Sequence, residues 1–156
     1  MNKLIILNLI FLVLFSGCNT SQDEIIIVPK DYIGYVIIVY DQENGVDENI
    51  KDGKRLMLIP KEGILQTKCS LNSDWGGFPM FYYENANESN RIPFNIEYEN
   101  IPINSISAYG GTSATVNKDL KGNSVLRYVQ YYIGNKSQID SIYNVVEGMD
   151  ITEIIK

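Results

Sequence analysis

The chain has 156 residues, of which 45% are apolar, 11% aromatic and 21% charged, and its net charge at neutral pH is −6. This length and apolar content suffice for one domain with its own hydrophobic core and exclude a disordered chain. The acidic surface repels nucleic acid and anionic lipid head groups, so neither is an expected partner. The chain contains no histidine, which excludes the commonest general base, the commonest zinc ligand and the usual catalytic triads.

The N-terminal segment is typical of a secretory signal. Residues 1–3 carry a positive charge, residues 4–15 are almost entirely apolar, and two small residues, Ser16 and Gly17, stand before Cys18. The apolar run is shorter than the ~20 helical residues that span a bilayer. We therefore expect a signal peptide at residues 1–17, and its removal takes Lys3 away and makes the mature chain one unit more negative.

Residues 15–18, Phe-Ser-Gly-Cys, resemble the lipobox of bacterial lipoproteins. In that class a diacylglycerol is attached to the cysteine thiol, the signal is removed, and the cysteine becomes the acylated N-terminus. The resemblance implies lipidation of Cys18 and attachment to a membrane of the bacterial cell envelope, the outer membrane in a Gram-negative cell. The alternative is an ordinary signal peptide in which Cys18 has no role. Once Cys18 is acylated, only Cys69 remains, and no intramolecular disulfide can form.

The rest of the sequence predicts a polar tether at residues 18–24 and a single β-rich domain at residues 25–156. Runs of β-branched and aromatic residues between turn residues predict strands at 25–28, 35–40, 55–59, 64–67, 78–84, 91–98, 101–109 and 125–133. The strands at 78–84 and 91–98 bracket a polar loop and predict a hairpin. Short strands at this spacing favour an antiparallel β-sandwich or small barrel.

One C-terminal helix completes the predicted fold, which is mostly β. Asn135 or Ser137 can cap its start, and Gly148 can end it. Its apolar face is predicted from the helical spacing of four residues, Ile139, Ile142, Tyr143 and Val146. The segment 151–155 is predicted to be a last strand or a frayed end.

Two segments resemble an uncharacterised family of small bacterial lipoproteins. Residues 28–36, Val-Pro-Lys-Asp-Tyr-Ile-Gly-Tyr-Val, are similar to the pattern Ile-Pro-x-x-Tyr-x-Gly-x-Val. Residues 59–67, Ile-Pro-Lys-Glu-Gly-Ile-Leu-Gln-Thr, are similar to Ile-Pro-x-x-Gly-Ile-Leu-x-Thr. The resemblance covers about residues 26–70, implies a single envelope domain, and supplies no catalytic residues. Residues 27–31 and 58–62 also resemble each other, but five residues are too few to establish a repeat.

The densest aromatic patch runs from Trp75 to Tyr83, and Trp75, Phe78 and Tyr82 are its candidate contact residues for a ligand or partner. Exposed, such rings stack on sugars or anchor a protein partner. Buried, they form the end of a sandwich and one core strand, in which Phe81 and Tyr83 lie on the face opposite Tyr82.

Two loops carry weaker signals. The acidic loop at residues 41–52 offers oxygens that calcium prefers, but its spacing does not fit an EF-hand, and a solvated hairpin is the commoner interpretation. The glycine-rich segment 109–113 lacks the lysine of a phosphate-binding loop and is predicted to connect two strands. No catalytic residue, metal site or cofactor is expected.

These observations favour a lipid-anchored, non-catalytic envelope protein whose role is binding or structural. The expected partners are the membrane, through the anchor, and an envelope or extracellular protein or glycan. One alternative is an immunity or inhibitor lipoprotein that neutralises a basic enzyme or toxin, which predicts salt-sensitive binding. Another is a carboxylate-dependent glycan hydrolase, for which the spacing nominates no pair of acids.

Overall fold

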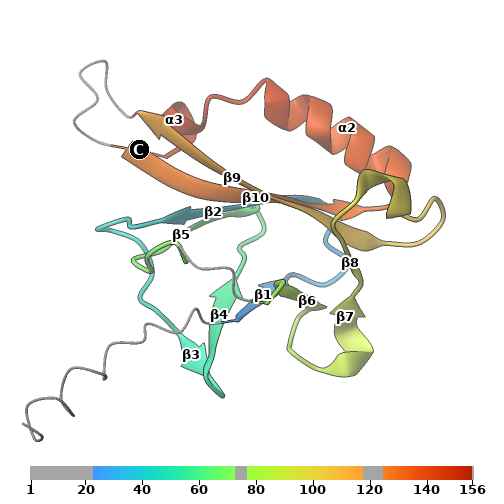
Figure 1. Cartoon of the computed structure of the whole chain (residues 1–156), viewed down its shortest axis with the longest axis horizontal. Helices are drawn as coiled ribbons and strands as arrows, with labels where there is room; N and C mark the ends of the chain where they lie inside the picture. The colour runs from blue at the N-terminus through green and yellow to red at the C-terminus, as the bar shows by residue number, and fades with distance from the viewer. Residues whose placement is uncertain (1–22, 73–76, 118–124, 156) are drawn as a thin grey trace, which may run out of the picture.

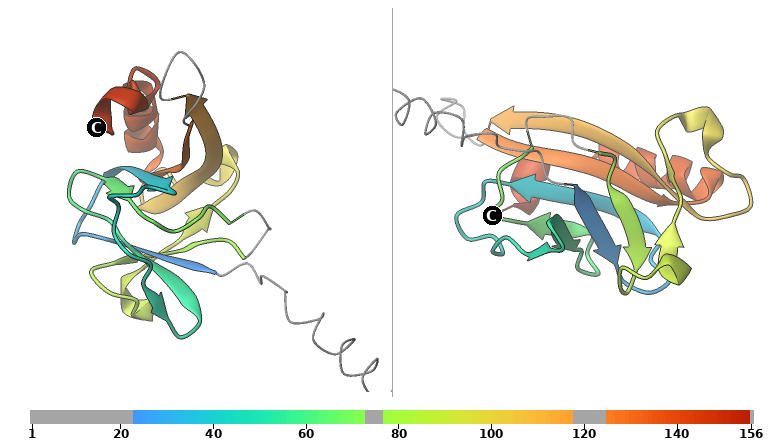
Figure 2. Two further views of the ribbon diagram at one scale, coloured as in Figure 1. Left: turned by 90° about the vertical axis from the view of Figure 1, so that its left-hand side faces the viewer. Right: turned by 60° about the horizontal axis from the view of Figure 1, so that its bottom comes forward.

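Two facing β-sheets and a layer of helices make up the computed structural model, which describes residues 23–72, 77–117 and 125–155. The first sheet has the strand order β3-β4-β1-β6-β7, and the second has the order β5-β2-β10-β9-β8. Helix α2 crosses the outer face of the second sheet (Figure 1). The views in Figure 2 show the same three layers from two other directions.

The strands are short except in the middle of the second sheet. The first sheet consists of β3 (Ile50–Lys51), β4 (Lys54–Leu58), β1 (Glu24–Val28), β6 (Met80–Tyr83) and β7 (Arg91–Ile92). The second consists of β5 (Ile64–Gln66), β2 (Gly34–Tyr40), β10 (Val125–Gly134), β9 (Ser107–Asn117) and β8 (Phe94–Asn95). Two 3₁₀ turns, η1 (Glu88–Asn90) and η2 (Tyr98–Asn100), lie in the segment between β6 and β9.

Three prolines pass the chain from the first sheet to the second. Pro29 separates β1 from β2, Pro60 separates β4 from β5, and Pro93 separates β7 from β8. Proline lacks the amide hydrogen that a sheet ladder needs and biases the residue before it to an extended backbone. The residues before these prolines are all buried at the layer between the sheets: Val28, Ile59 and Ile92.

The first two corners stack on each other. Strand β1 pairs with β4 in parallel, with Ile27 opposite Leu58, and β2 pairs with β5 in parallel, with Ile37 opposite Ile64. We call β1–β2 and β4–β5 the two proline arches. Each has the same turn: the Tyr32 amide donates to the Pro29 carbonyl, and the Gly63 amide to the Pro60 carbonyl, at 3.2 and 3.0 Å. The similarity of residues 27–31 to 58–62 therefore corresponds to two stacked copies of one structural unit.

The predicted sandwich with mostly β structure and a C-terminal helix is confirmed, but its strands are not all antiparallel. The central strands β2, β10 and β9 are antiparallel, and the predicted hairpin exists as β6 paired with β7. Both sheets are mixed because four other pairs are parallel: β1 with β4, β1 with β6, β2 with β5 and β8 with β9. The corners at Pro29 and Pro60 account for two of these pairs: each sends its strand to the opposite sheet, so β4 runs beside β1 and β5 beside β2 in the same direction.

Two predicted strands have different bounds. The run at 91–98 is divided at Pro93 into β7 and β8, which belong to different sheets. The strand predicted at 101–109 begins only at Ser107 and continues to Asn117 as β9. The glycine-rich segment 109–113, predicted to connect two strands, therefore lies inside β9. Gly110 and Gly111 have φ angles of +121° and +100°, and Gly111 is an extra residue between the pairs Tyr131–Gly110 and Gln130–Thr112. This is a β-bulge, for which glycine supplies the backbone freedom.

The core has one part between the sheets and two parts under the helices. The first includes Ile26, Val36, Ile38, Phe81 and Ile133, which are fully buried. The second covers the outer face of the second sheet beneath α3 and includes Ile37, Val39, Leu126 and Ile151. The third lies beneath α2 and consists of Ile101, Tyr132, Ile139 and Val146. The second sheet is thus buried on both faces over much of its area.

Helix α2 (Lys136–Glu147) begins and ends where the sequence predicts. The Asn135 side chain accepts the Gln138 amide at 3.0 Å, the Gln138 side chain accepts the Asn135 amide at 2.9 Å, and Gly148 follows the last turn. This reciprocal capping box satisfies two backbone donors at the helix start. The segment predicted as a strand or frayed end instead forms a short helix, α3 (Ile151–Ile154). Of the helices in the described ranges, none has the length and apolar character to cross a bilayer.

A buried ionic network closes the end of the sandwich where the described chain begins. Arg55 is only 8% exposed, and its guanidinium donates to Glu48 at 2.8 Å, to the Ser70 carbonyl at 3.0 Å and to Glu24 at 3.4 Å. The Tyr40 hydroxyl also donates to Glu24, at 3.1 Å. Burial raises the pKa of Glu24 despite these partners. Breaking such a pair by removing one member leaves an uncompensated buried charge.

Substitution of one glycine in the second arch tests the turn that joins the sheets. Gly63 has a φ of +79°, and a Cβ there would overlap the Tyr32 hydroxyl and the Tyr35 carbonyl. Gly53 has a similar φ of +74° and open space around it. We expect Gly53→Ala to lower the free energy of unfolding by ~1 kcal/mol, the cost of the left-handed backbone alone. We expect Gly63→Ala to lower it by a further ~2 kcal/mol through overpacking, measured by urea unfolding. Equal losses in the two variants would contradict the close approach at the turn.

Candidate functional site

The predicted aromatic patch does not form one surface in the described part of the chain. Phe78 is 58% exposed, and its ring lies 6.1 Å from that of Phe94 at the rim of the core. Tyr82 is buried, and its hydroxyl donates to Glu88 at 3.1 Å. Phe81, its neighbour in β6, belongs to the core between the sheets, so Tyr82 lies on the other face, as predicted. Trp75, like Cys18, lies outside the described residues, so its role stays a prediction.

The carboxylates of the acidic loop at residues 41–52 are largely engaged with cationic side chains. Asp41 pairs with Arg127 at 3.3 Å, Asp47 pairs with Lys68 at 2.7 Å, and Glu48 is bound by Arg55. Within residues 23–72, 77–117 and 125–155, no group of three or more histidine, cysteine, aspartate or glutamate side chains is arranged to hold a metal ion.

A groove of about 490 Å³ lies where η2, β9 and α2 meet. Its walls combine three tyrosines with an acid, an amide and one aliphatic side chain: Tyr98, Tyr109, Tyr143, Asp140, Asn144 and Ile139. We call it the tyrosine groove. Aromatic walls with a few polar groups are typical of binding sites, because rings supply contact area and polar atoms fix orientation.

The tyrosines of the groove form a connected row of rings. Tyr109 lies opposite Tyr132 across the β9–β10 pairing, with ring centres 6.3 Å apart and nearly parallel planes. Tyr98 meets Tyr109 edge to face at 6.1 Å, and Tyr143 meets Tyr132 at 5.8 Å. Tyr132 is the buried base of this row, and its burial raises its pKa to about 12. The sheet therefore presents a rigid aromatic floor to the groove.

Helix α2 supplies the polar wall. Its buried side chains include Ile139 and Val146, and beside them lies a stripe of five residues. Asp140, Tyr143 and Asn144 line the groove, Lys136 contacts Tyr98 at one end of the stripe, and Glu147 contacts Tyr143 at the other. Side chains three and four residues apart lie next to each other on a helix, so the stripe is continuous. It runs from a lysine at the helix start to a glutamate at the helix end.

Both exposed tyrosines of the groove are tied to carboxylates. The Tyr98 hydroxyl donates to Asp140 at 2.6 Å, and this hydrogen bond raises the pKa of Tyr98. The charge of Glu147 and its hydrogen bond with Tyr143 raise the pKa of Tyr143. Both shifts favour the protonated phenols. Their hydrogens are already donated, so they present oxygen acceptors and ring faces to a ligand.

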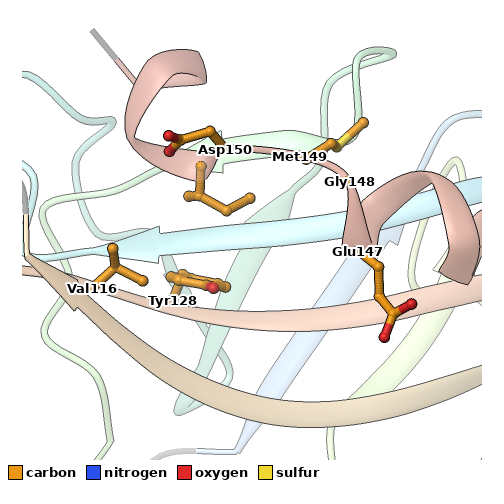
Figure 3. A pocket seen from close by; sticks show the side chains of 7 residues that line it. Val116, Tyr128, Glu147, Gly148, Met149 and Asp150 are labelled. Carbon is orange, nitrogen blue, oxygen red and sulfur yellow. The ribbon is translucent and has the colours of Figure 1, made fainter.

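A second, shallower hollow of about 360 Å³ lies at the C-terminal end of α2. Figure 3 shows Val116 and Tyr128 on the strands, Glu147 at the end of α2, and Asp150 on the chain that joins α2 to α3. Asp150 serves the fold here, because its carboxylate accepts the amide and hydroxyl of Thr152 at 2.9 and 2.6 Å and caps α3. Glu147 links the two hollows, since it borders this one and contacts Tyr143 in the tyrosine groove.

Most of the groove was not predicted from the sequence. The helical spacing assigned Tyr143 to the apolar face of the helix, but Tyr143 is 45% exposed while Ile139 and Val146 are buried. Tyr98 and Asp140 are distant in the chain and meet only through the fold. The signal that could have indicated the site is the polar and aromatic stripe of α2, which lies directly beside its apolar face.

The chain is similar to a known sequence family and to a solved structure. The model of the family of unknown function DUF6843 matches residues 20–142, a range that begins just after Cys18 and ends within α2. A crystal structure described as a "putative lipoprotein" from Bacillus anthracis is similar at 18% identity with a TM-score of 0.46, over 72% of this chain and 69% of that one. No curated protein matches the chain.

The stability of the protein is expected to fall steeply between pH 10 and pH 12. Burial raises the pKa of Tyr132 to about 12 from the ordinary value of 10.0. A group whose pKa is raised by folding stabilises the folded state fully below its unfolded pKa, and this contribution is lost as the pH rises through the folded pKa. Urea unfolding at several pH values, with tyrosinate absorbance followed in parallel, measures the decline. Tyr132→Phe should show a shallower decline over this range; an unchanged slope would contradict the assignment.

Proposed function

The chain belongs to the family of unknown function DUF6843, and on that premise we propose that it is a lipid-anchored, non-catalytic binding protein of the bacterial cell envelope. Two independent features support the proposal, one in the N-terminal sequence and one in the fold. The first concerns where the protein is held, and the second concerns what it does there.

The N-terminal sequence supports the anchor. A basic start, an apolar run and small residues precede Cys18, and the family match begins two residues after this cysteine. The first strand starts at Glu24, so the tether between anchor and domain reaches at most ~20 Å. Each buried CH₂ of an acyl chain contributes ~0.8 kcal/mol of membrane affinity, and two chains hold a protein stably. Attachment through Cys18 therefore keeps the domain close to the membrane surface.

The tyrosine groove is the single observation that carries the binding role. Its floor is rigid because Tyr132 is buried and its ring lies near those of Tyr109 and Tyr143. Its phenols have raised pKa values, which is the opposite of the change that activates a tyrosine for acid–base chemistry. A rigid aromatic site with fixed acceptors suits recognition of a ligand or partner.

Exchange of each cysteine tests the anchor. We expect Cys18→Ala to abolish acylation, so that the protein appears as unprocessed precursor or is released from the membrane fraction. Cys69→Ala is the matched control, since Cys69 is a buried free cysteine of the core and should leave acylation and membrane retention unchanged. Cell fractionation measures membrane retention, and intact-mass spectrometry measures processing and acylation. Normal processing and membrane retention of Cys18→Ala would contradict the anchor.

A further inference from the structure

We propose that the tyrosine groove binds the cationic side chain, arginine or lysine, of a basic protein partner. The inference rests on the proposed binding function and names the chemistry of what the groove receives. It is carried by the arrangement of carboxylates and ring faces at the groove and by one exposed apolar side chain near it.

The groove presents negative charge in a fixed geometry. Asp140 is held by the Tyr98 hydroxyl at 2.6 Å, and Glu147 is hydrogen-bonded with Tyr143. Each carboxylate keeps further lone pairs for another donor, because a carboxylate accepts several hydrogen bonds. A guanidinium or ammonium group entering the groove finds the Asp140 carboxylate on its wall, the Glu147 carboxylate beyond Tyr143, and tyrosine rings to pack against.

An internal cation already uses one ring in this way. The Lys136 ammonium lies 4.0 Å from the centre of the Tyr98 ring and donates to the Tyr98 carbonyl at 3.2 Å. Cations favour the face of an aromatic ring within about 6 Å of its centre. Lys136 occupies the N-terminal end of the stripe, so Tyr109 and Tyr143, which line the groove together with Asn144, remain for an external cation.

The surroundings of the groove favour a protein as the source of this cation. Ile103 is 72% exposed. Ile103 adjoins the start of the helix, because the Pro102 carbonyl accepts the Lys136 amide at 3.0 Å. A free small cation would leave this apolar side chain in water, whereas a protein interface would cover it. The net charge of −6 also attracts a basic partner over longer distances.

A peptide titration tests the proposal on the lipidated full-length protein in polyoxyethylene detergent, with ring resonances of ¹³C-labelled tyrosine followed by NMR. The probes are acetyl-Gly-Arg-Gly-amide, the neutral isostere acetyl-Gly-citrulline-Gly-amide, and a tetramer of N-acetylglucosamine. We expect the arginine peptide to shift the signals of Tyr98, Tyr109 and Tyr143 saturably. The citrulline peptide should bind at least about fivefold more weakly, because it lacks the charge that the rings and carboxylates attract.

Three variants locate the effect. Asp140→Asn and Glu147→Gln should each weaken binding of the arginine peptide by about threefold or more, whereas Glu43→Gln should leave it unchanged. Glu43 is exposed on the acidic loop and has the same change in charge, so it controls for net charge alone. Equal binding of arginine and citrulline peptides, or an equal loss in Glu43→Gln, would overturn the cation site.

The remaining outcomes separate this inference from the proposed function. Saturable shifts of the same tyrosines by the sugar tetramer, with no response to arginine, would overturn the basic partner and leave the groove as a glycan site. No shift from any probe would overturn the groove as a binding site together with the inference. Neither result would alter the membrane anchor, which the cysteine variants test separately.

Discussion

The proline corners are the constraint on which the rest of the structure depends. A strand that reaches Pro29, Pro60 or Pro93 cannot continue its ladder, because proline supplies no amide hydrogen, and the buried residue before each proline fixes the point of the turn. At each corner the chain therefore passes from the first sheet to the second. The two sheets are thus joined by chain connections at three prolines, in addition to the side-chain packing between them.

The third corner also builds the tyrosine groove. Pro93 delivers β8 to the edge of the second sheet, where Asn95 pairs in parallel with Tyr109 of β9. The turn η2 follows directly, so Tyr98 is placed beside the Tyr109 ring. The outer face of the same sheet must be covered because Ile37, Val39 and Tyr132 point to it, and α2 and α3 provide that cover. The groove is the place where the cover is incomplete and polar side chains of α2 meet the rings of the sheet.

Local patterns in the sequence predicted the elements well, because they depend on residues that are close in the chain. The strand at 35–40, the helix capped by Asn135 and the hairpin around residues 85–90 all follow from β-branched runs, capping chemistry and turn residues. The directions of the strands were not predictable in this way. The sequence shows a proline after each of the predicted strands at 25–28 and 55–59, but only the pairing of Ile27 with Leu58 shows that these two strand ends stack.

The site was harder to predict because its parts come from separate elements. Tyr143 satisfied the helical apolar pattern, yet it lies at the margin of the buried face, where spacing alone does not distinguish a core residue from the wall of a groove. Asp140 gains its role from Tyr98 in η2, a contact that only the corner at Pro93 makes. The concentration of aromatic residues at 75–83 predicts Phe78 and Tyr82 as contact residues. This concentration does not indicate that the two side chains lie on different surfaces.

Photo-crosslinking in living cells tests the central claim most directly. A photoreactive phenylalanine at position 144 lies in the tyrosine groove, and the same residue at position 52 lies on an exposed turn of the first sheet's edge. The account predicts that position 144 captures one basic protein, that position 52 does not, and that Asp140→Asn abolishes the product. Identical products from both positions, or a product from position 144 that is not a basic protein, would contradict it.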